Sequence, residues 1–190
     1  AFVDVMDYND YSHIDCLLSK YSTLKCLTYS DWLRKAYSHI VKNYRCEYVY
    51  KNELIKLLLS EYGTKNTVYF NEFRAGSSIA DMAMFNGESK AFEIKTEYDS
   101  PQRLDKQLDD YMSLFDRSYI VIPETKVENY QGVVNPAIGI IVMYFYKGKI
   151  TLNHYKEAEP NTNFNHRVLM SCLRTDEYKN IVLNLGGSLD

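Results

Sequence analysis

The sequence has 190 residues, of which 46% are hydrophobic and 25% are charged. This balance is typical of a globular protein with a sizeable core, and it argues against a disordered or fibrous chain. No apolar run is long enough to cross a membrane and no secretory signal stands out, so we expect a cytoplasmic protein without a membrane partner. The formal net charge is −3, but residues 20 to 51 carry seven basic side chains against two acidic ones, which is compatible with a local basic face.

The cysteines and histidines give no sign of a zinc site. The four cysteines show no C-x-x-C pairing, and the four histidines are scattered along the chain. We therefore expect free thiols in a reducing compartment. The cysteines are Cys16, Cys26, Cys46 and Cys172.

Helices are predicted in the first third of the chain. A short helix is indicated around residues 14–18. From Ser30, apolar residues recur at helical spacing as far as Val41, with basic residues on the other side, which predicts an amphipathic helix that packs on the core and presents charge to phosphate. A further helix is predicted from Asn52 to Tyr62, where Gly63 is placed to end it.

Strands follow in the middle of the chain. Residues 67–73 contain β-branched and aromatic residues at the density of a strand. Residues 79–85 and 91–95 are two further apolar runs on either side of Asn86-Gly87, a dipeptide that favours a tight turn. The sequence therefore predicts a β-hairpin with its turn at residues 86 and 87.

The last part of the chain predicts a helix, a buried strand and a second hairpin. Ser100-Pro101 is a helix start signal, and the apolar stripe after it reaches Phe115. Residues 118–122 are apolar enough for a central strand covered on both faces. Beyond a polar stretch we expect a hairpin that extends the sheet, and then one or two helices. The ranges are 124–136 for the polar stretch, 138–146 and 149–155 for the hairpin strands, and 164–185 for the helices.

Charged residues interrupt the first hairpin. Asp81 lies inside its first strand, and Glu93 and Lys95 lie in its second. Alternate residues of a strand point to the same side, so Glu93 and Lys95 project together, with Asp81 on the neighbouring strand. Two carboxylates and one ammonium group suit metal-assisted phosphodiester hydrolysis, because the carboxylates hold a hard cation such as Mg²⁺ and the lysine orients the attacking water.

This segment resembles the PD-(D/E)XK nuclease superfamily, and in particular its small stand-alone bacterial members. Asp81 stands at the position of the first Asp, and Glu93-Ile94-Lys95 stands at the (D/E)XK element. Ala80 replaces the proline of the name, which the superfamily tolerates. The resemblance implies that Asp81, Glu93 and Lys95 are catalytic. It also implies that Asp81, Glu93 and the backbone carbonyl of Ile94 bind Mg²⁺, for which Mn²⁺ substitutes.

A third acid is expected by the same resemblance, and two residues are candidates for it. Glu72 lies at the end of the preceding strand, before a glycine-containing turn, as in the small bacterial members. Glu53 lies in the first turn of the predicted helix, where the superfamily often has an extra acid. On that resemblance to the small bacterial members we prefer Glu72 as the catalytic residue. A glutamate near a helix N-terminus, such as Glu53, also complements the helix dipole without any catalytic role.

A second element of the resemblance lies about a dozen residues after Lys95. Gln107 and Tyr111 have the Q-x-x-x-Y spacing of RecB-like members, and Arg103 lies one helical step earlier on the same line. The resemblance implies that these three residues position the nucleic acid. Three aspartates on the same helix put negative charge there, and we expect them to face away from DNA.

We therefore expect an α/β protein with a restriction-endonuclease-like core of helix, three strands, helix and strand. The whole chain, residues 1–190, is predicted to form a single domain. Within it we expect a helical extension at residues 1–51, the nuclease core at 52–123, and a C-terminal hairpin with helices at 124–190.

The expected function is a metal-dependent nuclease, with DNA favoured over RNA as the partner. Roles as a toxin, a defence effector or a repair enzyme all fit the same chemistry, and a homodimer is compatible with the sequence. The alternative is a catalytically silent module that binds nucleic acid or protein on the same fold.

Overall fold

The structure is a computed structural model that describes residues 11–21, 28–132, 134–147 and 149–188. Contacts divide the chain into two compact units, residues 1–40 and residues 41–190, and each is described by itself. The expected organisation as a single domain with an extension at residues 1–51 stays a prediction. No helix in the described ranges is long and apolar enough to cross a membrane.

The first unit contains two helices, α2 (Ser12–Tyr21) and α3 (Tyr29–Asn43), the second of which crosses into the following unit. Within the first unit, the Tyr29 hydroxyl donates a 2.7 Å hydrogen bond to Asp15. Both helices occur where the sequence predicts them. No residue of α3 is buried.

The second unit is built on a mixed sheet with the strand order β1-β2-β3-β4-β5-β6. The pairs β1/β2, β2/β3 and β5/β6 are antiparallel, and the pairs β3/β4 and β4/β5 are parallel. The protein is therefore a mixed α/β protein. The strands are β1 (Val68–Ala75), β2 (Ser78–Phe85), β3 (Ser89–Ile94), β4 (Arg117–Pro123), β5 (Gly139–Tyr146) and β6 (Lys149–Lys156).

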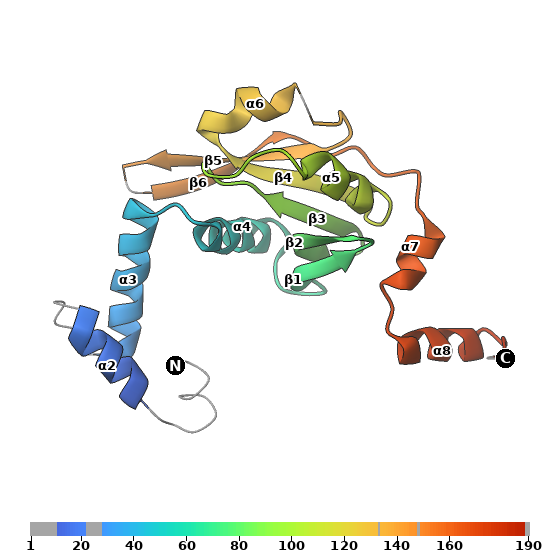
Figure 1. The fold of residues 1–190 in the computed structure, drawn as a ribbon, viewed down its shortest axis with the longest axis horizontal. Coiled ribbons are helices and arrows are strands. Elements are labelled where there is room, and N and C mark those ends of the chain that lie inside the picture. The colour runs from blue at the N-terminus through green and yellow to red at the C-terminus, as the bar shows by residue number, and fades with distance from the viewer. Residues whose placement is uncertain (1–10, 22–27, 133, 148, 189–190) are drawn as a thin grey trace. The chain divides into compact units, whose positions relative to one another are not determined.

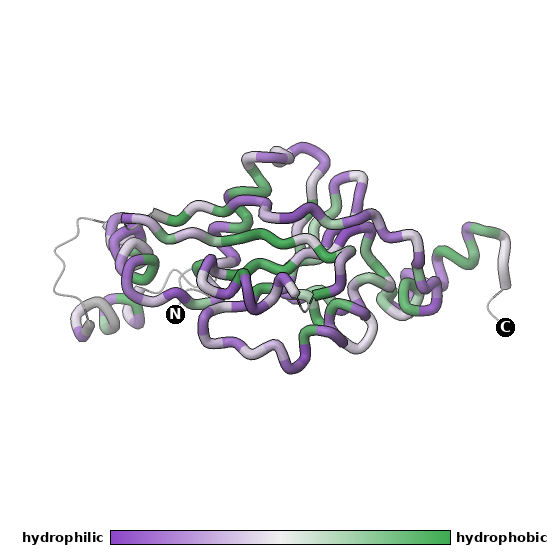
Figure 2. The backbone as a smooth tube through the Cα atoms, turned by 90° about the horizontal axis from the view of Figure 1, so that it is seen from above, coloured by the Kyte–Doolittle hydropathy of each residue, from purple (hydrophilic) through white to green (hydrophobic). Residues whose placement is uncertain are grey.

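Helices cover both faces of this sheet (Figure 1). Helix α4 (Glu47–Tyr62) lies on one face, where Tyr50, Leu54 and Leu58 are buried against alternate residues of β2 to β6. Helices α5 (Leu104–Met112) and α6 (Val127–Gln131) lie on the other face, with a separate cluster of buried residues. Figure 2 shows the apolar residues concentrated along the strands between these layers.

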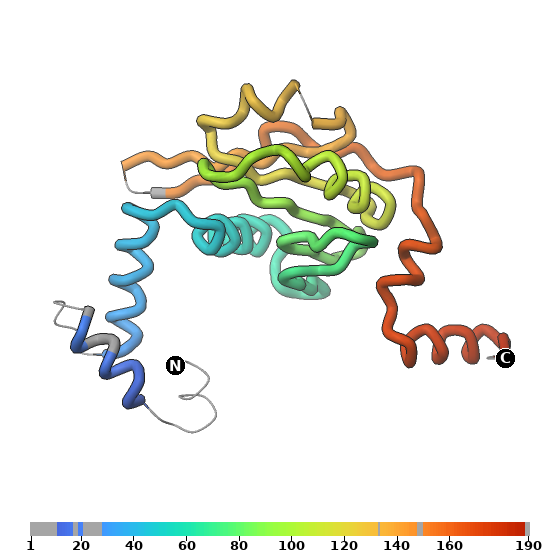
Figure 3. The backbone as a smooth tube through the Cα atoms, viewed as in Figure 1, coloured from blue at the N-terminus to red at the C-terminus, as the bar shows by residue number. Residues whose placement is uncertain are grey.

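The end of the chain leaves the sheet after β6. Figure 3 traces it through an extended segment to α7 (His166–Ser171) and α8 (Thr175–Asn184). Val168 and Cys172 pack against the cluster on the α5 face, whereas no residue of α8 is buried. Cys16, Cys46 and Cys172 are free thiols, as predicted, and Cys26 lies outside the described residues.

Both predicted hairpins are confirmed. Strands β2 and β3 pair across the Asn86-Gly87 turn, where Gly87 has a φ of +98°, in the region that favours glycine. Strands β5 and β6 pair antiparallel and extend the sheet beyond β4. Strand β4 is buried on both faces from Ser118 to Pro123, as its apolar run predicts.

Two predicted helix starts are wrong. Helix α4 begins at Glu47, before the predicted Asn52, because Val49 and Tyr50 continue its buried face. Helix α5 begins at Leu104, after the predicted Ser100. Residues 101–103 instead form a bend and a turn, in which the Leu104 N–H donates to the Pro101 carbonyl.

The polar stretch after β4 holds regular structure that was not predicted. It contains a 3-10 turn, η1 (Glu124–Lys126), followed by α6, where no regular element was predicted. Only Tyr130 of α6 is buried, so a five-residue helix of this kind has almost no apolar periodicity to read.

One close approach in the sheet generates a stability prediction. Gly139 pairs with Tyr119, and a Cβ atom on Gly139 would lie 2.3 Å from the Tyr119 ring and 2.8 Å from the Ala158 main-chain nitrogen. Neither group can move without disturbing the sheet. The variant Gly139→Ala should therefore lose about 1–3 kcal/mol of unfolding free energy in chemical denaturation. The control Gly132→Ala has nothing within 4 Å of the added atom and should change little; equal effects would contradict the packing argument.

Candidate functional site

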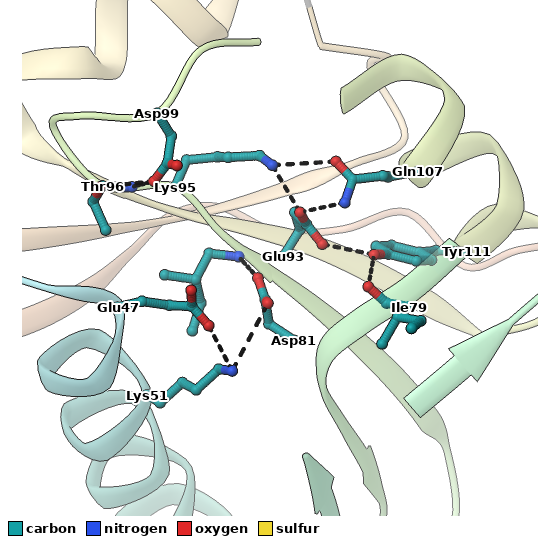
Figure 4. A network of polar contacts seen from close by, with 11 residues as sticks. Glu47, Lys51, Ile79, Asp81, Glu93, Lys95, Thr96, Asp99, Gln107 and Tyr111 are labelled. Atoms are coloured by element: carbon teal, nitrogen blue, oxygen red, sulfur yellow. Dashed lines mark hydrogen bonds and ion pairs between the residues drawn. The ribbon is translucent and has the colours of Figure 1, made fainter. Parts of the chain in front are cut away.

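Three acidic residues come from the first three strands: Glu72 from β1, Asp81 from β2 and Glu93 from β3. On β1, the residues on either side of Glu72 pair with those on either side of Asp81. Toward β3, Asp81 Oδ2 accepts a hydrogen bond from the main-chain N–H of Ile94, the residue after Glu93. The predicted hairpin thus brings Asp81 and Glu93 together at one end of the strands (Figure 4).

Glu93 is the centre of this group. The residue is only 3% exposed, so its carboxylate needs hydrogen-bond partners in place of water. Its Oε1 accepts hydrogen bonds from Lys95 Nζ at 2.8 Å and from Gln107 Nε2 at 2.7 Å. Its Oε2 lies 2.6 Å from the Tyr111 hydroxyl. The predicted acid, the lysine and both residues of the Q-x-x-x-Y element therefore meet at one carboxylate.

Gln107 and Tyr111 stand one turn apart on α5 and both point at β3 (Figure 4). Gln107 also accepts a 3.1 Å hydrogen bond from Lys95, so it bridges the acid and the lysine. Tyr111 is fully buried, and its hydroxyl also lies 2.8 Å from the Ile79 carbonyl. Burial and the charge of Glu93 raise the pKa of Tyr111, which keeps the hydroxyl protonated as a donor.

Asp81 accepts fewer hydrogen bonds than Glu93 in the described structure. Its Oδ2 accepts a 2.7 Å hydrogen bond from the Ile94 main-chain N–H, and its Oδ1 lies 3.9 Å from Lys51 Nζ. Burial raises the pKa of Asp81 to about 7, and the charge of Glu93 adds to the effect against the opposing hydrogen bond from Ile94. Asp81 therefore holds a proton more tightly than an ordinary aspartate.

Helix α4 contributes two residues that the sequence did not single out. Glu47 and Lys51 stand at the start of the helix, and their side chains form an ion pair of 2.6 Å that faces Asp81 (Figure 4). A Glu-Lys pair four residues apart is usual on any exposed helix face, which is why the sequence gives it no special weight. The early start of α4 is what brings this pair to the site.

Two of the predicted residues do not join the group. Glu53 forms a 2.5 Å ion pair with Lys56 on its own helix. Arg103 is exposed at the beginning of α5, and its side chain contacts neither Glu93 nor Lys95 in the described structure.

Glu72 lies beside the group in an unusual backbone conformation. Its φ is +55°, a region that non-glycine residues rarely occupy. Its side chain is exposed, and its charge is close enough to raise the pKa of Lys51. Of the two candidates for a third acid, Glu72 is therefore near the site and Glu53 is engaged elsewhere.

The loop that follows Lys95 is fixed by its own contacts. Asp99 accepts hydrogen bonds of 2.7 Å from both the main-chain N–H and the hydroxyl of Thr96. Glu97 accepts one from Arg45 at 3.2 Å and one from Tyr50 at 3.1 Å, which ties the loop to α4.

Helix α6 adds one residue that the sequence did not indicate. Burial raises the pKa of the Tyr130 hydroxyl, while the charge of Lys95 lowers it and the charge of Asp99 raises it. Tyr130 is buried in the cluster on the α5 side of the sheet.

The donor set suits a hard divalent cation. Within the described ranges, no three His, Cys, Asp or Glu residues are arranged to hold a metal ion. Mg²⁺, however, is commonly bound through one or two carboxylates and keeps several waters. Asp81 and Glu93 supply those two carboxylates, and Oδ1 of Asp81 has only the long contact to Lys51 among the described residues.

The fold and the site define an α/β protein with a buried acid–lysine cluster at the end of a central hairpin. Residues 41–190 match the family model described as Bacteriophage P4 protein cII, so the chain belongs to this family. Protein cII of Enterobacteria phage P4 is 27% identical over 110 residues, which are 58% of this chain and 42% of that protein. The chain thus spans less than half the length of this curated relative.

Two solved structures are also similar. A protein of unknown function from Silicibacter pomeroyi, SPO1766, has 15% identity and a TM-score of 0.46, over 73% of this chain and 92% of that one. SfsA from Pyrococcus furiosus, solved in complex with Ca²⁺, has 16% identity and a TM-score of 0.30, over 68% of this chain and 64% of that one. At these scores neither likeness decides the fold or the function.

The raised pKa of Asp81 generates a prediction about stability and pH. In the unfolded chain an aspartate loses its proton near pH 4, whereas folded Asp81 keeps it to about pH 7. The folded state therefore binds more protons between these values, and the unfolding free energy falls as pH rises through this window. Asp81→Asn removes this ionisation, so its unfolding free energy relative to the parent protein should increase from pH 4 to pH 8.

Chemical denaturation at several pH values measures this difference. Asp105→Asn, at an exposed position on α5, is the matched control and should show no such trend. A difference between Asp81→Asn and the parent that stays constant across the pH range would contradict the prediction.

Proposed function

We propose that this chain is a divalent-metal-dependent nuclease of the PD-(D/E)XK type, with DNA as the favoured substrate. The observation that carries the proposal is the meeting of Asp81, Glu93 and Lys95 with Gln107 and Tyr111 at one end of a buried hairpin. The element order α4, β1, β2, β3, α5, β4 is the order of a restriction-endonuclease-like core, which supports the finer assignment of the fold.

The proposed metal ligands are Asp81, Glu93 and the main-chain carbonyl of Ile94, with Mg²⁺ as the ion and Mn²⁺ as its substitute. Such an ion activates a bound water and neutralises the charge that develops on the phosphate. The chain's own residues hold the ligands in place for it. The Ile94 N–H fixes one oxygen of Asp81, and Gln107 and Tyr111 fix both oxygens of Glu93.

Lys95 is proposed to orient the attacking water or to contact a phosphate oxygen. Its ammonium group has three N–H donors, of which Glu93 and Gln107 take two. The third donor is available to a water or a phosphate. The 12% exposure of its side chain keeps competing solvent low at this position.

Gln107 and Tyr111 are proposed as positioning residues that act on the nucleic acid through Glu93 and Lys95. Their polar groups face these two residues, and Tyr111 has no exposed surface that a nucleic-acid strand could contact. Arg103, exposed just before α5, stays a proposed nucleic-acid-positioning residue. The third acid of the proposed site has two candidates. On helix α4, Glu47 is a better candidate than Glu53, because its ion pair with Lys51 faces Asp81. The other candidate is Glu72, on β1.

The alternative is a module that binds nucleic acid or protein without catalysis. Cleavage assays separate the two functions directly.

The test is cleavage of linear and circular double-stranded DNA, single-stranded DNA and RNA, each with Mg²⁺, Mn²⁺ or EDTA. The protein should cut at least one DNA substrate with either metal and none in EDTA. Glu93→Gln and Lys95→Met should each lower the rate by at least about 10²-fold, because each removes a group that acts on the charge developing at the phosphate.

The matched controls are Glu128→Gln and Lys106→Met, which make the same changes at exposed positions on α6 and α5. Circular dichroism verifies that every variant is folded. Metal-independent cutting, or equal activity in site variants and controls, would point to a contaminant. No cutting of any substrate would leave the non-catalytic module.

A further inference from the structure

Lys51 is a second lysine beside the proposed metal ligands, on the side opposite to Lys95 (Figure 4). Its Nζ lies 2.6 Å from Glu47 Oε1 and 3.9 Å from Asp81 Oδ1. Its side chain is 19% exposed and that of Asp81 is 21% exposed, so solvent screens the pair only in part. Lys51 is therefore the nearest cation that the described structure offers to Asp81.

Packing of α4 gives no reason for a lysine at this position. The helix is attached to the sheet by Tyr50, Leu54 and Leu58, all of which are buried. Lys51 lies at the edge of this contact, and its polar end points toward the carboxylates instead of away into solvent (Figure 4). The position of the Lys51 ammonium group is thus explained by the nearby carboxylates and not by the apolar face of α4.

The surrounding charges keep Lys51 in its ammonium form. Burial lowers the pKa of Lys51, but the hydrogen bond to Glu47 and the charges of Asp81, Glu47 and Glu72 outweigh burial and raise it. The hairpin side of the site has a similar arrangement, in which Lys95 is paired with Glu93. Each of the two central carboxylates thus has its own lysine.

The two lysines differ in how firmly they are held to the central carboxylates. Lys95 makes a 2.8 Å hydrogen bond to Glu93 and a second hydrogen bond to Gln107. Lys51 is within hydrogen-bond distance of Glu47 but not of Asp81, at 3.9 Å. Its contact with Asp81 is electrostatic and can be given up without losing the bond to Glu47.

We propose that Lys51 is the internal counter-ion of the metal site. In the metal-free protein its ammonium group offsets the negative charge at Asp81, and it would give up this 3.9 Å contact, while keeping its 2.6 Å bond to Glu47, when a divalent cation bound Asp81. This inference rests on the proposed function, because it needs Asp81 to be a metal ligand. Lys51 then competes with the metal for one carboxylate, so its charge sets how tightly the site binds the ion.

The test measures Mn²⁺ affinity by calorimetry on the full chain, which needs no nucleic acid and no activity. Lys51→Met should bind Mn²⁺ about tenfold more tightly than the parent protein, because the competing charge is gone. Lys51→Arg keeps the charge and should bind within about twofold of the parent. Lys56→Met is the matched control, since it removes an exposed lysine from the same helix, and it should also stay within about twofold.

A measurement on the parent protein covers the case in which Lys51→Met does not fold. The NMR signal of the Lys51 side chain, assigned by its loss in Lys51→Arg, should move when Mg²⁺ saturates the protein, while that of Lys56 should not. An unchanged signal, or a Lys51→Met variant with equal or weaker Mn²⁺ affinity, would overturn the role of Lys51 and leave the nuclease proposal standing. If the parent protein binds neither ion, both proposals fail.

Discussion

The buried carboxylate of Glu93 is the constraint on which the rest of the site depends. An unpaired charge at 3% exposure would cost several kcal/mol, so the fold must supply donors from more than one element. Gln107 and Tyr111 do so because they stand one turn apart on α5. A slip of α5 by one residue would turn both away from β3. The Tyr111 hydroxyl also contacts the Ile79 carbonyl near the start of β2, two residues before Asp81. The position of α5 is therefore linked to both strands that carry the acids.

The electrostatics of the site follow from placing two acids close together on adjacent strands. Burial of Asp81, and then the charge of Glu93, favours a proton on Asp81. The two lysines moderate this repulsion from opposite sides, one from β3 and its loop, the other from α4. The site is thus held by groups from both faces of the sheet. Arg45, just before α4, and Tyr50 within it also bind Glu97 in the loop after Lys95.

Local sequence signals were sufficient wherever one segment determines its own structure. The Asn86-Gly87 turn, the alternation that sends Glu93 and Lys95 to one side, and the apolar run of β4 all depend on near neighbours. The start of α4 at Glu47 depends on distant neighbours, because Tyr50 is buried against the sheet. The late start of α5 has a local cause, the turn around Pro101, which the helix start signal at Ser100-Pro101 did not reveal.

The site was predicted in part for the same reason. Asp81, Glu93 and Lys95 belong to one hairpin, and Gln107 and Tyr111 follow it at a telling spacing. Glu47 and Lys51 look in the sequence like any solvated helix pair, and only the docking of α4 gives them a place beside Asp81. Their position beside Asp81 could not be predicted without knowing the orientation of α4 on the sheet.

The backbone at Glu72 has a consequence for how this family can change. A residue at φ +55° is strained unless it is glycine or asparagine, and either replacement would relieve about 1 kcal/mol of local strain. If the carboxylate at position 72 has no function, substitutions to glycine or asparagine should therefore accumulate there. A lineage that retains an acid at this position retains it although the backbone conformation disfavours it. Position 72 is thus a place where the history of the sequences can reveal whether selection acts on the side chain.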